Sequence, residues 1–352
     1  MNAPFAPARE AVRVVNLRQP DEAMRIEAFV ADMAGSVFHR PAWLLAVERG
    51  AGQRARGLAV ETGETITGWL PLNEVHSPIF GRMLASSGFA VEGGALADSA
   101  ATANTLCRAA EEYAVRLSCP TIELRGGHAP ADWNRRADSH CGFVAPILAD
   151  DEAQLLAIPR KQRAEVRKGM DRDFEITVGV GLEDRAAHYA VYGESVRNLG
   201  TPVFPRSLFE AVLDLLDADI LTVRDRDRPV ASVLSLYHGD AVLPYWGGGT
   251  LAARVLRAND RMYFELMRHA RTRGCRRFDF GRSKTGSGAW SFKKNWGFEP
   301  EPLTYSTWTA PGTPHRDADP TSARHAARIA LWRKLPLALA NQLGPPIARG
   351  LG

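Results

Sequence analysis

Residues 259–298 read NDRMYFELMRHARTRGCRRFDFGRSKTGSGAWSFKKNWGF, and the first half of this stretch decides the expected fold. Side chains that suit a buried helix face recur at helical spacing at Met262, Leu266, His269 and Ala270. This spacing predicts a helix over 259–273, with Asn259 as its N-cap and Gly274 as its stop. The run RFDF at 277–280 follows and predicts a strand. A helix that leads directly into a strand is typical of layered α/β folds.

The same pattern occurs earlier in the chain, at a period of roughly 160 residues. In the first half, a strand–turn–strand pattern at 57–72 is followed by a predicted helix at 99–118 and a strand at 121–124. In the second half, a strand–turn–strand pattern at 220–236 precedes the helix and strand described above. The repeat predicts an α/β (α+β) chain of two domains, each a mixed β-sheet flanked by helices.

The length of 352 residues also favours two domains, because a domain has about 150 residues on average. Apolar residues make up 45% and charged residues 24%, which excludes a largely disordered chain. A net charge of +4 excludes a wholly basic nucleic-acid coat, so an anionic ligand must meet a local cluster of cations. The four cysteines form no CxxC pair, which predicts reduced, buried thiols and no metal site.

We expect an N-terminal tail over 1–12, domains over 13–149 and 150–309, and a basic C-terminal tail over 310–352. The domain boundary is placed at the acidic run Asp150-Asp151-Glu152. No apolar run approaches the roughly 20 residues that span a bilayer, and the first residues lack the pattern of a signal peptide. A cytoplasmic protein is therefore expected.

Residues 281–298, the second half of the stretch quoted first, contain candidate ligand-binding and catalytic residues. After the strand, a Gly- and Ser-rich loop with Arg282 and Ser283 lets a ligand approach closely, and a turn then presents Lys293 and Lys294. The aromatic side chains that would anchor this turn in the core are Phe292, Trp296 and Phe298. Such anchoring predicts that Lys293 is held as a fixed positive charge that suits an anion. A solvated pair of surface lysines is the alternative.

The run F-K-x-x-W-G at 292–297, preceded by FDFGRS and by the predicted helix, resembles the FemAB/FemX family and related GNAT-like acyltransferase domains. FHRPAW at 38–43 and LWRKLP at 331–336 are similar to the FemAB-type proteins associated with PEP-CTERM/exosortase exopolysaccharide loci. The resemblance covers nearly the whole chain. It implies a tandem of two GNAT-like domains, in agreement with the internal repeat.

The resemblance also implies an activity. It is the transfer of an acyl or aminoacyl group to an amine or hydroxyl of a cell-envelope or exopolysaccharide precursor. In the family, the lysine of this motif meets negative charge in the reaction centre, and here that residue is Lys293. Acyl transfer needs such a group because an oxyanion develops at the attacked carbonyl. The implied donors are acetyl-CoA or another acyl-CoA, or an aminoacyl-tRNA, with no metal.

A different class of protein also fits the sequence: a non-catalytic module with the GNAT fold that recognises a nucleotide-sugar or a lipid-linked glycan. Turnover with any donor separates the two classes.

A basic cluster occurs in IPRKQRAEVRK at 158–168. Arg160, Arg163 and Arg167 follow at i, i+3 and i+7, so a helix places them on one face. A phosphate-rich donor or acceptor can dock on such a stripe. An ordinary solvated helix face explains the same pattern equally well.

A glycine run follows an apolar strand at Trp246-Gly247-Gly248-Gly249. In a GNAT fold, the diphosphate of acetyl-CoA binds between the corresponding strand and the helix that begins here near Asn259, on free backbone N–H groups. The segment RVLRA at 254–258 lacks the glycines of the usual diphosphate loop, which weighs against acetyl-CoA. The glycines are also compatible with a simple turn or bulge.

Two histidines and the C-terminal tail are further candidates for a function. His39 and His238 are candidate bases, although structural roles are the simpler explanation. The tail from residue 321 has cations, aliphatic residues and a tryptophan but no acidic residue, so a peripheral membrane contact through 321–352 is one expectation. Docking onto its own domain is the other, because Pro336, Pro345 and Pro346 are expected to break a long helix.

Overall fold

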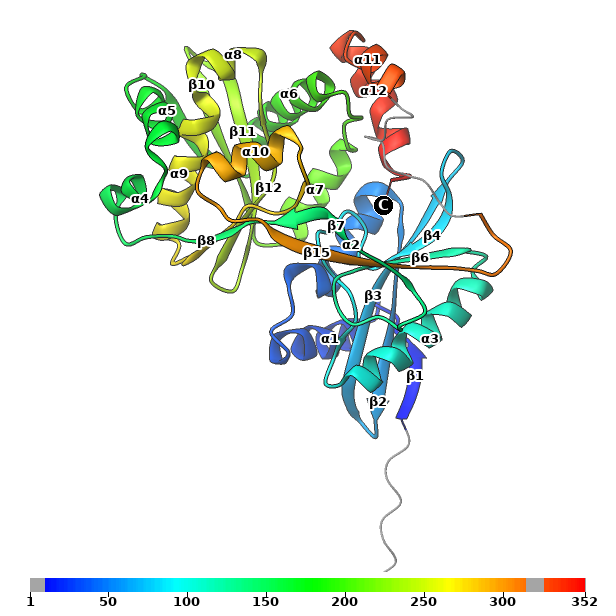
Figure 1. Cartoon of the computed structure of the whole chain (residues 1–352). Coiled ribbons are helices and arrows are strands. Elements are labelled where there is room, and N and C mark those ends of the chain that lie inside the picture. The colour runs from blue at the N-terminus through cyan, green and yellow to red at the C-terminus, as the bar shows by residue number, and fades with distance from the viewer. Residues whose placement is uncertain (1–9, 315–325, 352) are drawn as a thin grey trace, which may run out of the picture. The chain divides into compact units, whose positions relative to one another are not determined.

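The computed structural model describes residues 10–314 and 326–351, which fall into two compact units (Figure 1). Unit 1 contains residues up to Arg136, residues from Thr304 to Ala318, and the chain end from Arg349. Unit 2 contains Ala137–Leu303 and Asp319–Ala348. Most of the expected N-terminal tail and Arg324 of the C-terminal tail lie outside the described residues. The expected boundary near Asp150 lies within unit 2.

Unit 1 is built on one mixed sheet. Its paired strands are, in spatial order, β1 (Glu10–Val14), β2 (Arg54–Thr62), β3 (Thr65–Ser77), β4 (Gly81–Ala85), β6 (Thr121–Arg125) and β15 (Glu301–Thr309), with β5 (Leu96–Ala97) beside β3. All these neighbours are antiparallel except β4 and β6, which are parallel. Its helical elements are α1 (Pro20–Asp32), η1 (Val37–His39), α2 (Pro41–Ala51) and α3 (Ala100–Arg116).

Helices cover both faces of this sheet. Leu58 and Val60 of β2 pack with α3, whereas Ala59 between them packs with α1 and α2. This alternation follows from the two-residue period of a strand. The ring of Trp69 fills the space that a Cβ on Gly57 would occupy, at 1.9 Å, so only glycine fits at that point of β2.

Unit 2 repeats the plan. Its sheet has, in order, β8 (Val144–Pro146), β13 (Arg277–Asp279), β12 (Ala241–Gly249), β11 (Arg228–His238), β10 (Ala218–Asp225) and β9 (Glu175–Gly179). In addition, β7 (Asn134–Gly142) pairs with β14 (Ser283–Lys284). The helices are α4 (Asp151–Ala157), α5 (Arg160–Met170), α6 (Leu182–Leu199), α7 (Arg206–Leu215), α8 (Leu251–Leu256), α9 (Ala258–Thr272), α10 (Gly288–Asn295), α11 (Ala326–Trp332) and α12 (Leu337–Ala348).

The repeat expected from the sequence is confirmed by the connections. In unit 1 the helix α3 joins the parallel strands β4 and β6, and in unit 2 the helix α9 joins the parallel strands β12 and β13. All the other strand neighbours of the unit 2 sheet are antiparallel. The expected fold class, a tandem of mixed α/β layers, is therefore correct.

The two parallel strands of unit 2 separate early. Pairing between β12 and β13 is limited to Ala241 with Arg277 and Val242 with Phe278, although β12 continues to Gly249. A bulge also occurs in β12, where Tyr245 has no partner in the register with β11. The far end of β12 thus has an edge that no other strand covers in the described part of the chain.

The C-terminal helices pack on unit 2. Asn341 of α12 lies against Gly193 of α6, and Gly344 lies against the backbone of Val203. The expectation that prolines end this helix is wrong for Pro345 and Pro346, which lie inside α12. They stand within its last turn, where each removes one N–H donor to the carbonyl four residues earlier while the preceding turns keep their hydrogen bonds.

Candidate functional site

Lys293 lies in a short helix that its own sequence defines. The hydroxyl of Ser287 accepts a hydrogen bond from the N–H of Trp290 and caps α10, where the sequence predicts a turn. Only 8% of Lys293 is exposed. Its ammonium donates to the carbonyl of Gly281 at 3.1 Å and to that of Arg282 at 3.0 Å. The lysine therefore points into unit 2 and holds the loop that follows β13.

Aromatic rings surround the ammonium. The Nζ of Lys293 lies 5.3 Å from the ring centres of both Phe143 and Phe280. Burial lowers the pKa of Lys293 to about 7, the carboxyl of Asp279 opposes this shift, and Arg282 adds to it. Burial also raises the pKa of Asp279. A lysine with this pKa gains and loses its proton near neutral pH, a property common at functional sites.

Lys293 and Lys294 differ in their exposure to solvent. Lys294 is exposed, and its ammonium lies 4.8 Å from the ring centre of Trp290. The idea of a solvated surface pair therefore applies to Lys294 alone. Ser283 is buried in β14, and its hydroxyl has no hydrogen-bond partner among the residues that the structure describes.

Tyr263, which the sequence analysis did not select, joins α10 to the glycine strand. Its ring centre lies 4.6 Å from that of Phe280, 5.7 Å from that of Phe292 and 6.2 Å from that of Trp296. Its hydroxyl lies 3.1 Å from the position of a Cβ on Gly247. The available signal was its place four residues after Asn259, on the same face of the predicted helix.

The three glycines of the run are part of β12, where they make room for neighbouring side chains. A Cβ on Gly247 would meet Val233 at 3.0 Å, and one on Gly248 would meet the hydroxyl of Ser195 at 2.3 Å. Trp246, by contrast, packs in the core, with its ring centre 4.7 Å from that of Phe209. The run is a strand end with close side-chain approach, so of the predicted alternatives a turn is wrong, and a bulge occurs at Tyr245, just before the run.

The sequence predicts Asn259 as the N-cap of α9, and this prediction is wrong. The helix begins at Ala258, and its cap is Arg257 in the left-handed conformation, with φ of +61°. The reason is that α8 fills the segment between β12 and α9, so the chain reverses one residue earlier than expected. The side-chain oxygen of Asn259 is buried without a hydrogen-bond partner and lies 2.4 Å from the Cβ position of Gly249.

The arginine stripe lies next to α10. Gly297, with φ of +88°, follows α10, and a Cβ on it would lie 3.0 Å from Pro159, the residue before α5. Arg160 and Arg167 are exposed, and within residues 10–314 and 326–351 neither side chain has a hydrogen bond or ion pair. Arg163 instead donates to the carbonyls of Leu156 and Ile158, so it fixes the end of α4.

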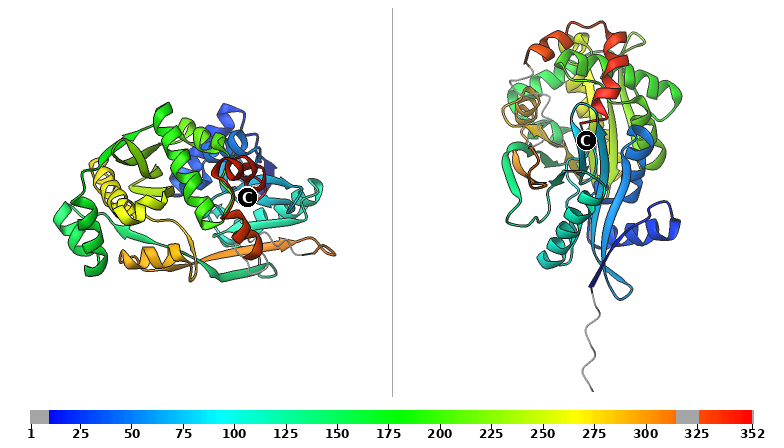
Figure 2. Two further views of the ribbon diagram at one scale, coloured as in Figure 1. Left: turned by 90° about the horizontal axis from the view of Figure 1, so that it is seen from above. Right: turned by 90° about the vertical axis from the view of Figure 1, so that its right-hand side faces the viewer.

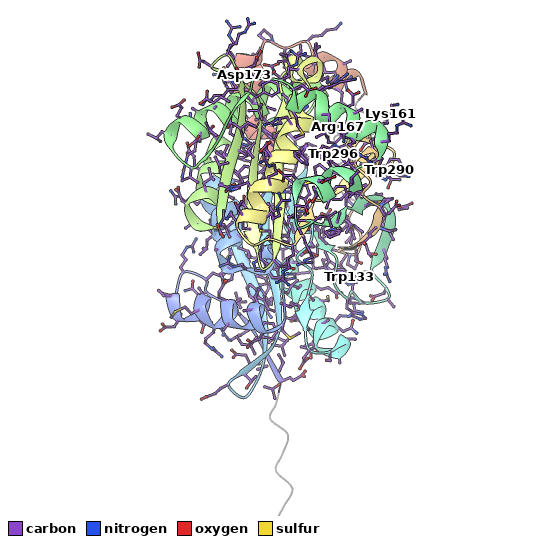
Figure 3. The ribbon with its side chains drawn as sticks, turned by 90° about the vertical axis from the view of Figure 1, so that its left-hand side faces the viewer. Trp133, Lys161, Arg167, Asp173, Trp290 and Trp296 are labelled. Atoms are coloured by element: carbon purple, nitrogen blue, oxygen red, sulfur yellow. The ribbon has the colours of Figure 1, made fainter. Side chains whose placement is uncertain are left out.

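Figure 3 shows Lys161 and Arg167 on α5, on the side of unit 2 where Trp290 and Trp296 are also seen. Gln162 of α5 donates to the buried carboxyl of Asp260 in α9 at 2.6 Å. The structure thus places three of the predicted groups, the α10 lysines, the glycine strand and the arginine helix, around α9 in one unit.

His39 has a structural role in unit 1. Its Nδ1 accepts from the backbone N–H of Ser36 at 3.1 Å, so its Nε2 carries the proton and donates to the carbonyl of Gly94 at 3.1 Å. With both ring nitrogens engaged, His39 is not placed to act as a base.

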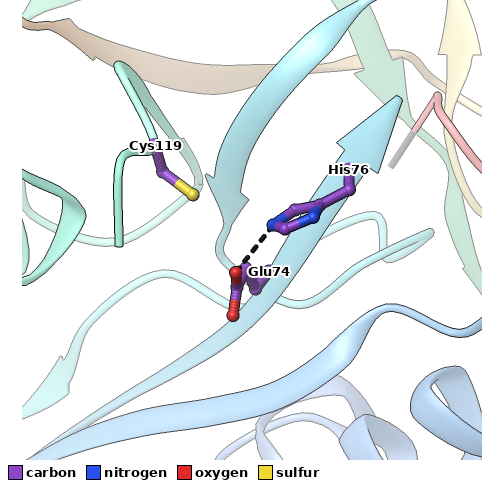
Figure 4. Close-up of side chains that lie close together, drawn as sticks. All are labelled: Glu74, His76 and Cys119. Atoms are coloured by element: carbon purple, nitrogen blue, oxygen red, sulfur yellow. Dashed lines mark hydrogen bonds and ion pairs between the residues drawn. The ribbon is translucent and has the colours of Figure 1, made fainter. Parts of the chain in front are cut away.

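Three side chains in unit 1 have the atoms of a metal site. Oxygen of Glu74, nitrogen of His76 and sulfur of Cys119 lie within 4.8 Å of one another (Figure 4). However, Glu74 accepts a hydrogen bond from Arg56 at 2.9 Å and pairs with Arg82 at 3.4 Å. Burial raises the pKa of the Cys119 thiol to about 11. Two guanidinium groups and a protonated thiol oppose a divalent cation, so we interpret the cluster as a buried ion-pair network.

Comparisons with known proteins agree with this geometry. Residues 160–294 match the family model described as acetyltransferase (GNAT) domain. A tandem GNAT protein from the clavulanic acid biosynthesis pathway superposes with a TM-score of 0.55 at 10% identity, over 87% of this chain and all of that chain. The chain is a tandem of two GNAT-like units.

Two further solved structures share this tandem arrangement. FemX superposes with a TM-score of 0.65 at 15% identity, over 84% of this chain and 96% of that chain. The C-terminal domain of a putative lysylphosphatidylglycerol synthetase from Agrobacterium fabrum superposes with a TM-score of 0.55 at 11% identity, over 82% of this chain and 91% of that chain. No curated protein matches the sequence. Residues 160–294 therefore carry a GNAT domain, and FemX shares the fold of the whole chain. None of the helices in the described ranges is both long and apolar enough to cross a bilayer.

Proposed function

We propose that this tandem GNAT-like chain transfers an acyl or aminoacyl group to an amine or hydroxyl of a cell-envelope or exopolysaccharide precursor, with Lys293 at the reaction centre. The observation that supports the proposal is the burial of Lys293 in the GNAT domain, with its ammonium on the loop that follows β13. The PEP-CTERM/exosortase context and a cytoplasmic location are part of this proposal, and they rest on the sequence resemblance.

The chemistry needs little covalent machinery. An amine or hydroxyl attacks the carbonyl of an ester or thioester, the carbonyl oxygen becomes negative, and the alkoxide or thiolate leaves with a proton. An ammonium has three N–H donors, and Lys293 uses two of them on Gly281 and Arg282. The third donor and the positive charge serve the developing oxyanion. Because the group sits among aromatic rings, its charge is screened less than at a solvated site.

The arginine helix supplies the phosphate contact. Acyl-CoA and aminoacyl-tRNA both carry phosphate, and the exposed guanidinium groups of Arg160 and Arg167 are available for it. The first turn of α9, where a diphosphate would bind, instead carries the carboxyl of Asp260 and follows the helix α8. Because α8 takes the place of a glycine-rich loop before this turn, we expect an aminoacyl-tRNA rather than an acyl-CoA as the donor.

The test is a transfer assay with matched variants of the neighbouring lysines. Purified chain is incubated with acetyl-CoA or with charged tRNA and with glycan-precursor amines, and products are followed by mass spectrometry. Lys293→Ala is expected to lower turnover by at least a hundredfold, whereas Lys294→Ala retains it, because only Lys293 is buried at the centre. Full activity of Lys293→Ala contradicts the proposed role.

A non-catalytic binding module is the second candidate. The observation that favours it is that the ammonium of Lys293 already bonds two carbonyls of its own chain. In that case, a nucleotide-sugar or lipid-linked glycan binds tightly in a titration, and no donor yields product.

A further inference from the structure

One end of unit 2 exposes aliphatic side chains from three helices that contact one another. Leu251 and Val255 lie on α8, Leu199 lies at the end of α6, and Leu331 lies on α11. Between 55% and 77% of each of these side chains is exposed. Isolated exposed leucines are ordinary, but several on adjoining helices form a patch that requires an explanation.

Side-chain contacts join α8 and α11 to α6. The carboxylate of Glu194 in α6 accepts a hydrogen bond from the backbone N–H of Leu251 at 3.0 Å. At the C-terminus of α6, five residues further on, Arg333 donates to the carbonyl of Leu199 at 3.1 Å, and a Cβ on Gly200 would meet Ile329 at 2.4 Å. Figure 1 shows α8, α6 and α11 at the same end of unit 2, and the view from above in Figure 2 faces this end.

The surface carries more cations than carboxylates, and its one carboxylate named above, Glu194, accepts a hydrogen bond from Leu251. Segments 195–206, 250–259 and 326–351 contain no aspartate or glutamate. Arg254 stands three residues after Leu251 and one before Val255, so all three share one face of α8. Arg254 and Lys334 are exposed, and within residues 10–314 and 326–351 neither side chain has a hydrogen bond or ion pair.

We propose that this end of unit 2, formed by α8, the C-terminus of α6 and α11, docks on the surface of a bilayer with anionic headgroups. Exposed aliphatic side chains together with the cations Arg254 and Lys334 match such a surface, because a bilayer has hydrocarbon chains beneath its negatively charged headgroups. A protein partner would have to present both an apolar surface and a set of acidic side chains. The surface extends the membrane contact expected for residues 321–352 to two helices of the GNAT domain, and it does not depend on the proposed activity.

The test is sedimentation of the full chain with vesicles. Vesicles of phosphatidylglycerol and phosphatidylcholine are compared with vesicles of phosphatidylcholine alone. The double variant Leu251→Ser/Val255→Ser is expected to bind the anionic vesicles at least about tenfold more weakly. The matched control is Met24→Ser/Val115→Ser in unit 1, where 62% and 64% of the side chains are exposed, and it binds as the unmodified chain does.

Charge is tested separately. Arg254→Glu is expected to weaken binding to anionic vesicles by about fivefold or more, while Arg276→Glu, another exposed arginine, has little effect. The proposal is overturned if the chain does not sediment with anionic vesicles or if both double variants lose binding equally. It is also overturned if Leu251→Ser/Val255→Ser instead abolishes a dimer seen by light scattering, because the patch is then covered by a second copy of the chain.

Discussion

The ammonium of Lys293 lies 3.0 Å from the carbonyl oxygen of Arg282, eleven residues earlier in the chain. This bond ties helix α10 to the loop between β13 and β14. The position of that loop therefore depends on whether Lys293 is protonated, because a neutral amine donates more weakly to a carbonyl.

The first prediction concerns pH. The pKa of Lys293 is about 7 in the folded chain and 10.5 in its ordinary state, so between these values the unfolded chain binds the extra proton. The free energy of unfolding should then rise with pH by about 1.4 kcal/mol per unit across this window. Below pH 7 both states hold the proton, and this gain is absent.

The measurement is urea unfolding of the unmodified chain and of Lys293→Met at pH 7, 8 and 9. The variant lacks the titrating group, so the stability difference between the two chains should change steadily with pH in favour of the unmodified chain. A constant difference contradicts the lowered pKa.

The second prediction concerns Gly297. Alanine there meets both a left-handed backbone and Pro159 at 3.0 Å, whereas alanine at Gly286 meets a left-handed backbone in open space. We expect Gly286→Ala to cost about 1 kcal/mol and Gly297→Ala about 1 kcal/mol more. Equal midpoints of denaturant unfolding for the two variants would show that the contact between α10 and α5 carries no strain.

A third prediction tests the close approach of α6 to the glycine strand. Gly248→Ala should destabilise the chain by about 1–3 kcal/mol, because the new methyl group meets Ser195. Ser195→Gly removes the clash, so the double variant should be more stable than the sum of the two single effects. Strict additivity of the two effects in the double-mutant cycle would contradict the predicted clash between the new methyl group and Ser195.

The fourth prediction concerns the ion-pair network of unit 1. The carboxylate of Glu74 is buried, yet hydrogen bonds from Arg56 and His76 outweigh the burial and hold its pKa below the ordinary value. Its contribution to stability is present above about pH 4.5 and is lost as pH falls through the lowered pKa.

Glu74→Gln should cost about 3 kcal/mol at pH 7, since it leaves Arg56 without its partner, and should make the unfolding midpoint less sensitive to acid. Zinc should not raise the thermal midpoint of the unmodified chain. Stabilisation by zinc that His76→Ala removes would instead establish a metal site.

The sequence predicted the larger features well, for local reasons. The local pattern of α9 and of its counterpart α3 predicted both crossover helices, and the aromatic residues around Lys293 predicted that it is held in place, whereas its burial became visible only in the structure. The cap of α9 was misplaced because Asn259 has good capping chemistry, whereas the capping position is decided by the length of α8.

The contacts of the candidate site were beyond a linear pattern. Tyr263 meets Gly247 and the α10 aromatics only because β13 separates from β12 after two residue pairs. The carbonyl partners of Lys293 depend on the left-handed turn at Gly281, with φ of +65°. Both sets of contacts result from tertiary packing, so the residue types alone do not predict them.

The uncovered edge of β12 has a consequence for the range of ligands. Beyond Val242, where its pairing with β13 ends, the strand runs past the hydroxyls of Tyr263 and Ser195, which lie against Gly247 and Gly248. Discrimination between cargoes then falls to a few neighbours such as Tyr263 and Ser195. Point substitutions at these positions would therefore retune the choice of transferred group while the sheet itself stays the same.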